Sequence, residues 1–241
     1  MIRHLAFVMA ALLFAGLPRA VAQDDYALFS DRAGSASLLY RGHKAYEYAL
    51  LYNGTYYLSS PEYLPGSVVY NGKFYRDILL NIDAARQDLI VRVGGVSYKL
   101  IAREYVQECA FGGRQFLNLQ YLYGETAPSG YWEVLYSGRA KVLRRVTKRL
   151  EQDIDGRKRD ETRYDGPFRM DIYQAFVYSA DYCYISEDGE IVPVKRRSDI
   201  LNLFDKPRRR DVRRHIRQQE GGSRLPFDRY CVEVLNYVES R

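Results

Sequence analysis

From about residue 45 to residue 170, the chain consists of short runs of β-forming residues separated by turn residues. Two similar Tyr-rich stretches, 18 positions apart, carry Asn53-Gly54 and Asn71-Gly72. Asn-Gly is favoured in tight hairpins because both central residues of a type I′ turn need a positive φ. Further turn signals are Gly94-Gly95, Asp155-Gly156 and Asp188-Gly189. Since no helical period separates these runs, the pattern predicts an antiparallel meander and not a βαβ sheet.

The hydrophobic period changes after Pro193, where apolar residues recur every three or four positions. Ser198-Asp199 can cap a first short helix. Pro207 suits the first position of a second helix, and Asp228 begins a third. We therefore expect an α+β fold, mainly an antiparallel β meander with C-terminal helices over about residues 198–239.

The first 22 residues are typical of a cleaved secretory signal. A short basic start precedes Leu5–Leu17, an uncharged run of 13 residues, and Ala20–Ala22 supplies small residues before Gln23. This run is too short for a membrane-spanning helix, which needs about 20 apolar residues, and no later stretch qualifies. We predict a signal peptide over residues 1–22 and one compact β-rich domain over 23–241. The expected location is the periplasm or the cell exterior, where the protein can associate with the outer membrane.

Export constrains the charge and the cysteines. Cleavage removes two of the 36 Lys and Arg side chains and no acid, so the mature chain keeps a net charge of +4. Cys109, Cys183 and Cys231 would meet an oxidising compartment. Cys231 falls on the apolar face of the last predicted helix, which leaves a Cys109–Cys183 disulfide as one possibility that spacing alone does not decide.

Several stretches together resemble a set of exported proteins of Bacteroidota-type Gram-negative bacteria. The stretches that carry the resemblance are Gly54–Tyr57, Gly66–Tyr75, Leu80–Ala84, Val134–Gly138 and Arg197–Leu201. The resemblance covers most of the mature chain and consists of turns, strand edges and caps. It implies an exported, β-rich protein, and it brings no activity and no catalytic residues.

No motif in the chain specifies a reaction. The spacings of serine nucleophiles, zinc ligands and phosphate-binding loops are absent, and the two His of the mature chain lie far apart. We therefore assign no catalytic, metal or cofactor site. Acidic Glu187–Glu190 is best explained as a hairpin tip and Asp83 as a strand-to-turn junction. The alternative function is a glycan hydrolase whose two carboxylates converge only in the fold.

The 23 tyrosines allow two interpretations. Tyrosine rings and hydroxyls on a sheet face suit the recognition of glycans or peptides. Tyrosine is also a good strand former with one apolar face and one polar end. Because many of the tyrosines flank turns, we favour the structural interpretation.

Two segments concentrate positive charge. Residues 139–149 hold six bases and no acid, but an acid-rich segment follows across the predicted Asp155-Gly156 turn. Opposite charges on two neighbouring strands stabilise each other, so this segment is expected to be neutralised internally.

The second segment, Lys195–Arg217, holds ten bases and three acids. Arginine dominates it, and its planar guanidinium binds phosphate and carboxylate oxygens in pairs. We predict a polyanion-binding helix made of Lys206, Arg208, Arg209, Arg210, Arg213, Arg214 and Arg217. The expected partners are anionic lipid headgroups, acidic polysaccharide or an acidic protein; export and the lack of an RNA-binding motif argue against nucleic acid. The sequence thus predicts an exported, non-enzymatic, envelope-associated protein with a binding or structural role.

Overall fold

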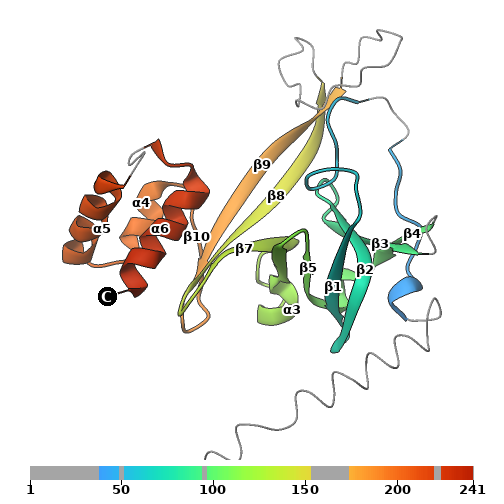
Figure 1. Cartoon of the computed structure of the whole chain (residues 1–241), viewed down its shortest axis with the longest axis horizontal. Coiled ribbons are helices and arrows are strands. Elements are labelled where there is room, and N and C mark those ends of the chain that lie inside the picture. The colour runs from blue at the N-terminus through green and yellow to red at the C-terminus, as the bar shows by residue number, and fades with distance from the viewer. Residues whose placement is uncertain (1–37, 49–51, 94–96, 153–173, 220–223, 241) are drawn as a thin grey trace, which may run out of the picture.

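The computed structural model describes residues 38–48, 52–93, 97–152, 174–219 and 224–240. The predicted signal peptide, the Asp155-Gly156 turn and the acidic run that follows it lie outside these residues. In the described part of the chain, ten strands form one antiparallel sheet, and three helices gather near the C-terminus (Figure 1). The predicted α+β meander with C-terminal helices is therefore confirmed.

The sheet order is β10-β9-β8-β7-β6-β5-β1-β2-β3-β4. The strands are β1 (Leu64–Tyr70), β2 (Lys73–Asp83), β3 (Asp88–Val93), β4 (Ser97–Ile101), β5 (Val106–Phe111), β6 (Arg114–Asn118), β7 (Tyr131–Ser137), β8 (Lys141–Gln152), β9 (Gln174–Ile185) and β10 (Ile191–Pro193). The helices are η2 (Leu38–Tyr40), η3 (Arg103–Tyr105), α3 (Leu119–Tyr123), α4 (Arg197–Asn202), α5 (Lys206–Gln218) and α6 (Phe227–Glu239).

The two Asn-Gly stretches have different structures. Asn71 and Gly72 have φ values of 50° and 71° and form the tight turn between β1 and β2, as predicted. The hairpin prediction at Asn53-Gly54 is wrong. The backbone of Asn53 pairs with Ala175 of β9 in a parallel bridge instead of with its own neighbours. Tertiary pairing thus takes the hydrogen-bonding groups that a local hairpin would use.

Segment 52–58 links distant parts of the sheet. At one end, Phe176 donates its N–H to the Asn53 carbonyl over 3.1 Å. At the other end, Leu58 donates to Ile82 of β2 over 2.9 Å. The turn after β2 also reaches β8, because the Gln87 amide donates to the Val146 carbonyl over 2.8 Å. These bonds draw the β2–β3 turn and the β8–β9 hairpin together, so the sheet is strongly curved.

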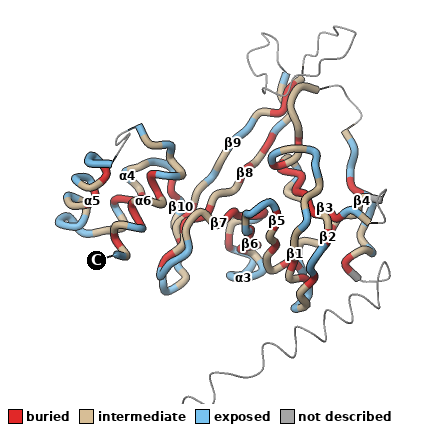
Figure 2. Tube along the Cα trace, in the orientation of Figure 1, coloured by how far each residue is buried: buried red, intermediate tan, exposed pale blue. Residues whose placement is uncertain are grey.

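Three apolar clusters fill the molecule. One lies among β1–β5, a second among Leu117, Trp132, Leu143 and Cys183, and a third beneath the C-terminal helices. Helices α4, α5 and α6 pack against residues of β7, β8 and β9 at one end of the sheet (Figures 1 and 2). Helix α6 is central to that layer, since it buries five residues: Tyr230, Cys231, Val234, Leu235 and Val238.

Asp199 caps the first C-terminal helix, as predicted, but from inside it. Helix α4 begins at Arg197, and the Asp199 carboxylate accepts the N–H groups of Lys195 and Arg196 from within the first turn, which lowers the pKa of that carboxyl. The sequence left a Cys109–Cys183 disulfide open; in the structure all three cysteines are buried and free.

Candidate functional site

The predicted polyanion-binding residues all lie on α5. The Asp205 carboxylate accepts the N–H of Arg208 over 3.1 Å and caps the helix start, and Pro207 occupies the first turn. Val212 and Ile216 are buried on one side of the helix, where they join the apolar cluster around α6. This apolar stripe fixes which side of α5 faces outward.

The basic side chains of α5 lie away from that stripe. Lys206, Arg208, Arg210, Arg213, Arg214 and Arg217 are exposed, and Arg209 is half-buried. Arg214 pairs with Asp211 over 3.4 Å, and Arg209 donates to the Asn202 amide oxygen over 2.9 Å. Within the described residues, no carboxylate forms an ion pair with the remaining basic residues: Lys206, Arg208, Arg210, Arg213 and Arg217. The positive charge of this helix is therefore largely uncompensated.

The first basic segment forms β8 and the turn before it, and Arg144, Arg145 and Arg149 of this segment pair with acids among the described residues. Arg145 binds Asp181 of β9 over 2.7 Å. Arg149 pairs with Glu151 on its own strand. The buried Lys148 ammonium donates to the Thr55 carbonyl over 2.9 Å. Internal neutralisation was predicted, and the acids found among the described residues come from β7, β8, β9 and α6; the segment after Asp155 lies outside these residues.

Arg144 is the most enclosed of these arginines. It contacts the buried Glu133 on β7 over 2.7 Å and also binds Asp228 at the start of α6. The Tyr182 hydroxyl donates to the same Asp228 over 2.5 Å. Asp228 was predicted only to begin the last helix. Its carboxylate also binds side chains of the sheet and so holds α6 against it. The carboxylates of Glu133 and Asp228 raise the pKa of Arg144 despite the opposing effect of burial.

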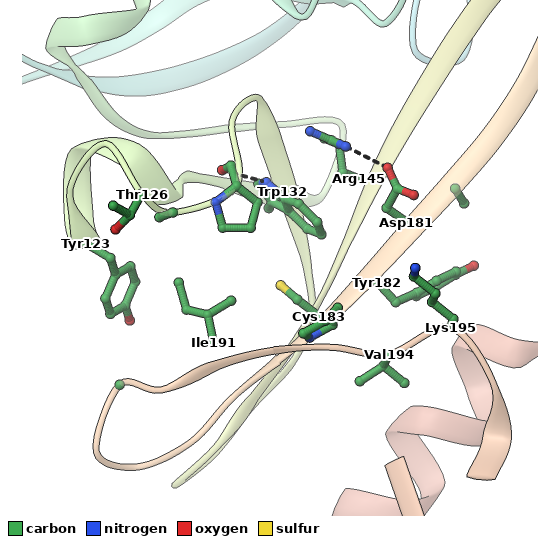
Figure 3. A pocket seen from close by; sticks show the side chains of 15 residues that line it. Tyr123, Thr126, Trp132, Arg145, Asp181, Tyr182, Cys183, Ile191, Val194 and Lys195 are labelled. Carbon is green, nitrogen blue, oxygen red and sulfur yellow. Dashed lines mark hydrogen bonds and ion pairs between the residues drawn. The ribbon is translucent and has the colours of Figure 1, made fainter. Parts of the chain in front are cut away.

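A large cavity lies elsewhere, between β8–β10 and the chain from α3 to β7. Its volume is about 710 Å³, and none of the basic residues of α5 lines it. Trp132, Cys183 and Ile191 contribute apolar surface, while Arg145 and Lys195 contribute positive charge. Figure 3 shows these side chains around one space. In this view Ile191 and Cys183 lie between Tyr123 on one side and Lys195 on the other.

Sequence reasoning did not find this cavity. Its residues belong to four strands, a helix and three connections, and its polar residues form no recognisable sequence motif. The only local signal near it was the Asp188-Gly189 turn, where Gly189 has a φ of 84° as predicted for a tight turn.

The carboxylates required by the hydrolase hypothesis do not meet in this cavity. Asp181 is its only acid among the described residues, and that acid is bound by Arg145. Asp83 is buried at the end of β2, where it accepts the N–H groups of Ala85 and Arg86, so it fastens a turn. The described residues also bring together no group of three His, Cys, Asp or Glu suited to a metal ion.

Many of the tyrosines form clusters in contact with one another. Tyr48, Tyr52 and Tyr56 pack their rings around Phe176 of β9. The Tyr57 hydroxyl lies 3.2 Å from the hydroxyls of both Tyr56 and Tyr63. Burial is the main cause that raises the pKa of Tyr56 and Tyr63. These contacts give the tyrosines a packing role, in agreement with the structural interpretation.

None of the helices in the described part of the chain has both the length and the hydropathy that a membrane crossing requires. No protein-family model matches the sequence, and comparisons with curated proteins and with solved structures give no match. The assignment of a function therefore depends on the chemistry of the two surfaces described above, the basic helix and the cavity.

Proposed function

We propose that this protein is an exported, non-enzymatic component of the cell envelope that binds polyanions through α5. The observation that carries the proposal is the set of exposed guanidinium groups on this helix that have no carboxylate partner in the described structure. Export is supported by the sequence pattern of residues 1–22 and by the resemblance to exported proteins.

The arrangement of these groups suits an extended anionic partner. Lys206, Arg210, Arg213 and Arg217 recur at steps of three and four residues, so they form one stripe along the helix. A stripe can contact several phosphate, sulfate or carboxylate groups at once, and each guanidinium can bind two oxygens. The stripe lies on an outer helix and outside the large cavity, which favours a macromolecular surface over a small molecule (Figure 1).

The test replaces Arg210, Arg213 and Arg217 with glutamine and measures retention on heparin and on vesicles that contain an anionic phospholipid. A basic residue near an anionic membrane contributes about 1 kcal/mol, so the triple variant should bind vesicles up to about a hundredfold more weakly. Binding of the wild-type chain should also fall steeply with salt, because the screening length shortens to about 8 Å at physiological ionic strength.

A control with the same loss of charge replaces the exposed Arg41, Arg76 and Arg139 with glutamine. This variant should keep most of the retention, because its substitutions lie outside α5. Equal losses in both triple variants would show that only net charge matters and would overturn the proposed site. Absence of wild-type retention on both supports would overturn polyanion binding, and retention on heparin alone would identify polysaccharide as the partner class.

A further inference from the structure

The large cavity has the dimensions of a small-molecule site. Its volume of about 710 Å³ falls within the range of roughly 300–1,000 Å³ found for ligand pockets. Strands β7, β8, β9 and β10 each contribute lining residues, and the chain after α3 closes one side. Because hydrogen-bonded strands hold most of its walls, the cavity is a permanent feature of the fold.

The interior of the cavity is apolar and firmly positioned. The Trp132 indole N–H is shared between the carbonyls of Ser129 and Pro128, over 3.1 and 3.3 Å, which fixes the ring. Burial raises the pKa of the Cys183 thiol to about 12, so this side chain stays neutral and acts as apolar lining. With Ile191, these residues form a surface that favours a hydrocarbon or ring.

The polar groups of the cavity are mainly donors. Arg145 stacks over Trp132, with its Cζ 5.1 Å from the ring centroid, and donates to Ser129 and Asp181. Its buried Nε has no acceptor among the residues that the structure describes. Lys195 lies near Tyr182 at the cavity edge (Figure 3), and its ammonium forms no ion pair with any described residue. Since the single acid is already bound by Arg145, the lining carries a net charge of +1.

We propose that this cavity binds a small apolar carboxylate. The apolar body of the ligand packs against Trp132, Cys183 and Ile191, and its carboxylate accepts a hydrogen bond from the Lys195 ammonium. A charge-assisted bond of this kind at the edge of an apolar site gives both affinity and orientation. The site is separate from α5, so it stands or falls independently of polyanion binding.

The protein contains a built-in reporter, because Trp132 is its only tryptophan. The experiment titrates the full mature chain with decanoate, below the concentration at which it forms micelles, and follows tryptophan emission. A saturable change is expected. Decanol, which has the same chain length without the charge, should bind about tenfold more weakly, the equivalent of one charge-assisted hydrogen bond.

Two variants locate the site. Lys195→Gln should remove the preference for decanoate over decanol, because it removes the cation but keeps the apolar lining. Ile191→Phe should weaken both ligands, because the larger ring fills the space. Ile191 is half-buried at the sheet edge, and a circular-dichroism melt checks that this variant is folded. The control Lys206→Gln removes a lysine charge on α5 and should change neither titration.

Different outcomes test the carboxylate assignment and the location of the site separately. Equal binding of decanoate and decanol by the wild-type chain, or an unchanged preference in Lys195→Gln, would overturn the carboxylate assignment. A tryptophan response that does not saturate, or one that Ile191→Phe leaves intact, would overturn the cavity as the binding site. Loss of heparin retention in the α5 triple variant without any change in decanoate binding would confirm that the two surfaces are independent.

Discussion

The arginines of β8 and those of α5 have the same chemistry but different surroundings. On β8, Arg144 and Arg145 lie beside acids from β7, β9 and α6, and each forms short ion pairs. On α5, Arg210, Arg213 and Arg217 are exposed and have no carboxylate partner in the described structure. The β8 arginines therefore hold the fold together, whereas the α5 arginines remain available for a partner.

This contrast shows that a count of charges along a segment does not assign its role. A strand inside a sheet has neighbours on both sides, and their side chains supply counter-charges at fixed distances. A helix on the outside of a layer presents one side to solvent, where only its own residues can supply counter-charges. A cluster of bases is consequently structural in one place and available for binding in the other.

The largest expected loss of unfolding free energy comes from a substitution on β8. Replacing Arg144 with methionine leaves the buried Glu133 and the carboxylate of Asp228 without their main partner. The expected loss is about 2–3 kcal/mol of unfolding free energy, near the lower limit for a broken buried pair. Arg114, 3.8 Å from Glu133, and Tyr182 still contact the two acids, which limits the loss. Urea denaturation measures the change.

The matched control for this experiment is Arg213→Met on α5. It removes the same group from an exposed position and should change the unfolding free energy by less than about 0.5 kcal/mol. Similar losses in the two variants would contradict the division between structural and available arginines.

A smaller effect is expected from Glu239, which fastens the end of α6 to the β7–β8 turn. Its carboxylate accepts the N–H groups of Arg139 and Ala140, each over 2.9 Å. Burial alone would raise the pKa of Glu239, but these two donors and the Tyr136 hydroxyl lower it below the ordinary 4.5. Glu239→Gln weakens these bonds and should cost about 1 kcal/mol at neutral pH.

The same carboxyl group gives a pH dependence of known sign. Because its pKa is lower in the folded chain, its stabilising contribution is complete above pH 4.5 and is lost as the pH falls through the folded-state value. Urea denaturation at pH 7 and pH 3 should show a smaller difference for Glu239→Gln than for the wild-type chain. An equal difference in the two proteins would contradict this assignment.

The smallest effect is expected from Arg214→Gln, which removes the ion pair with Asp211 on α5. Both side chains are largely exposed, at 72% and 47%, so water already screens the pair. The unfolding free energy should change by less than about 0.5 kcal/mol, while elution from heparin should shift to lower salt. A stability loss as large as that of Arg144→Met would show that α5 arginines are also structural.

Local features of the sequence predicted much of the fold. Asn71-Gly72 and Asp188-Gly189 encode their own turns, since the required positive φ depends on the residues themselves. The apolar spacing of Val212 and Ile216 likewise indicated which side of the second C-terminal helix is buried. The position of Cys231 on the buried face of the last helix was anticipated in the same way.

Other features depended on residues that are distant along the chain. Asn53-Gly54 has the sequence of a hairpin turn, yet its backbone pairs with β9. The partners of Arg144 and Arg145 and the walls of the cavity come from separate strands. The sequence alone therefore determined turns, helix faces and the placement of charge along the chain, because these follow from local backbone and side-chain preferences. Only the tertiary structure decided which charges are compensated and where a cavity forms, because both depend on which strands become neighbours.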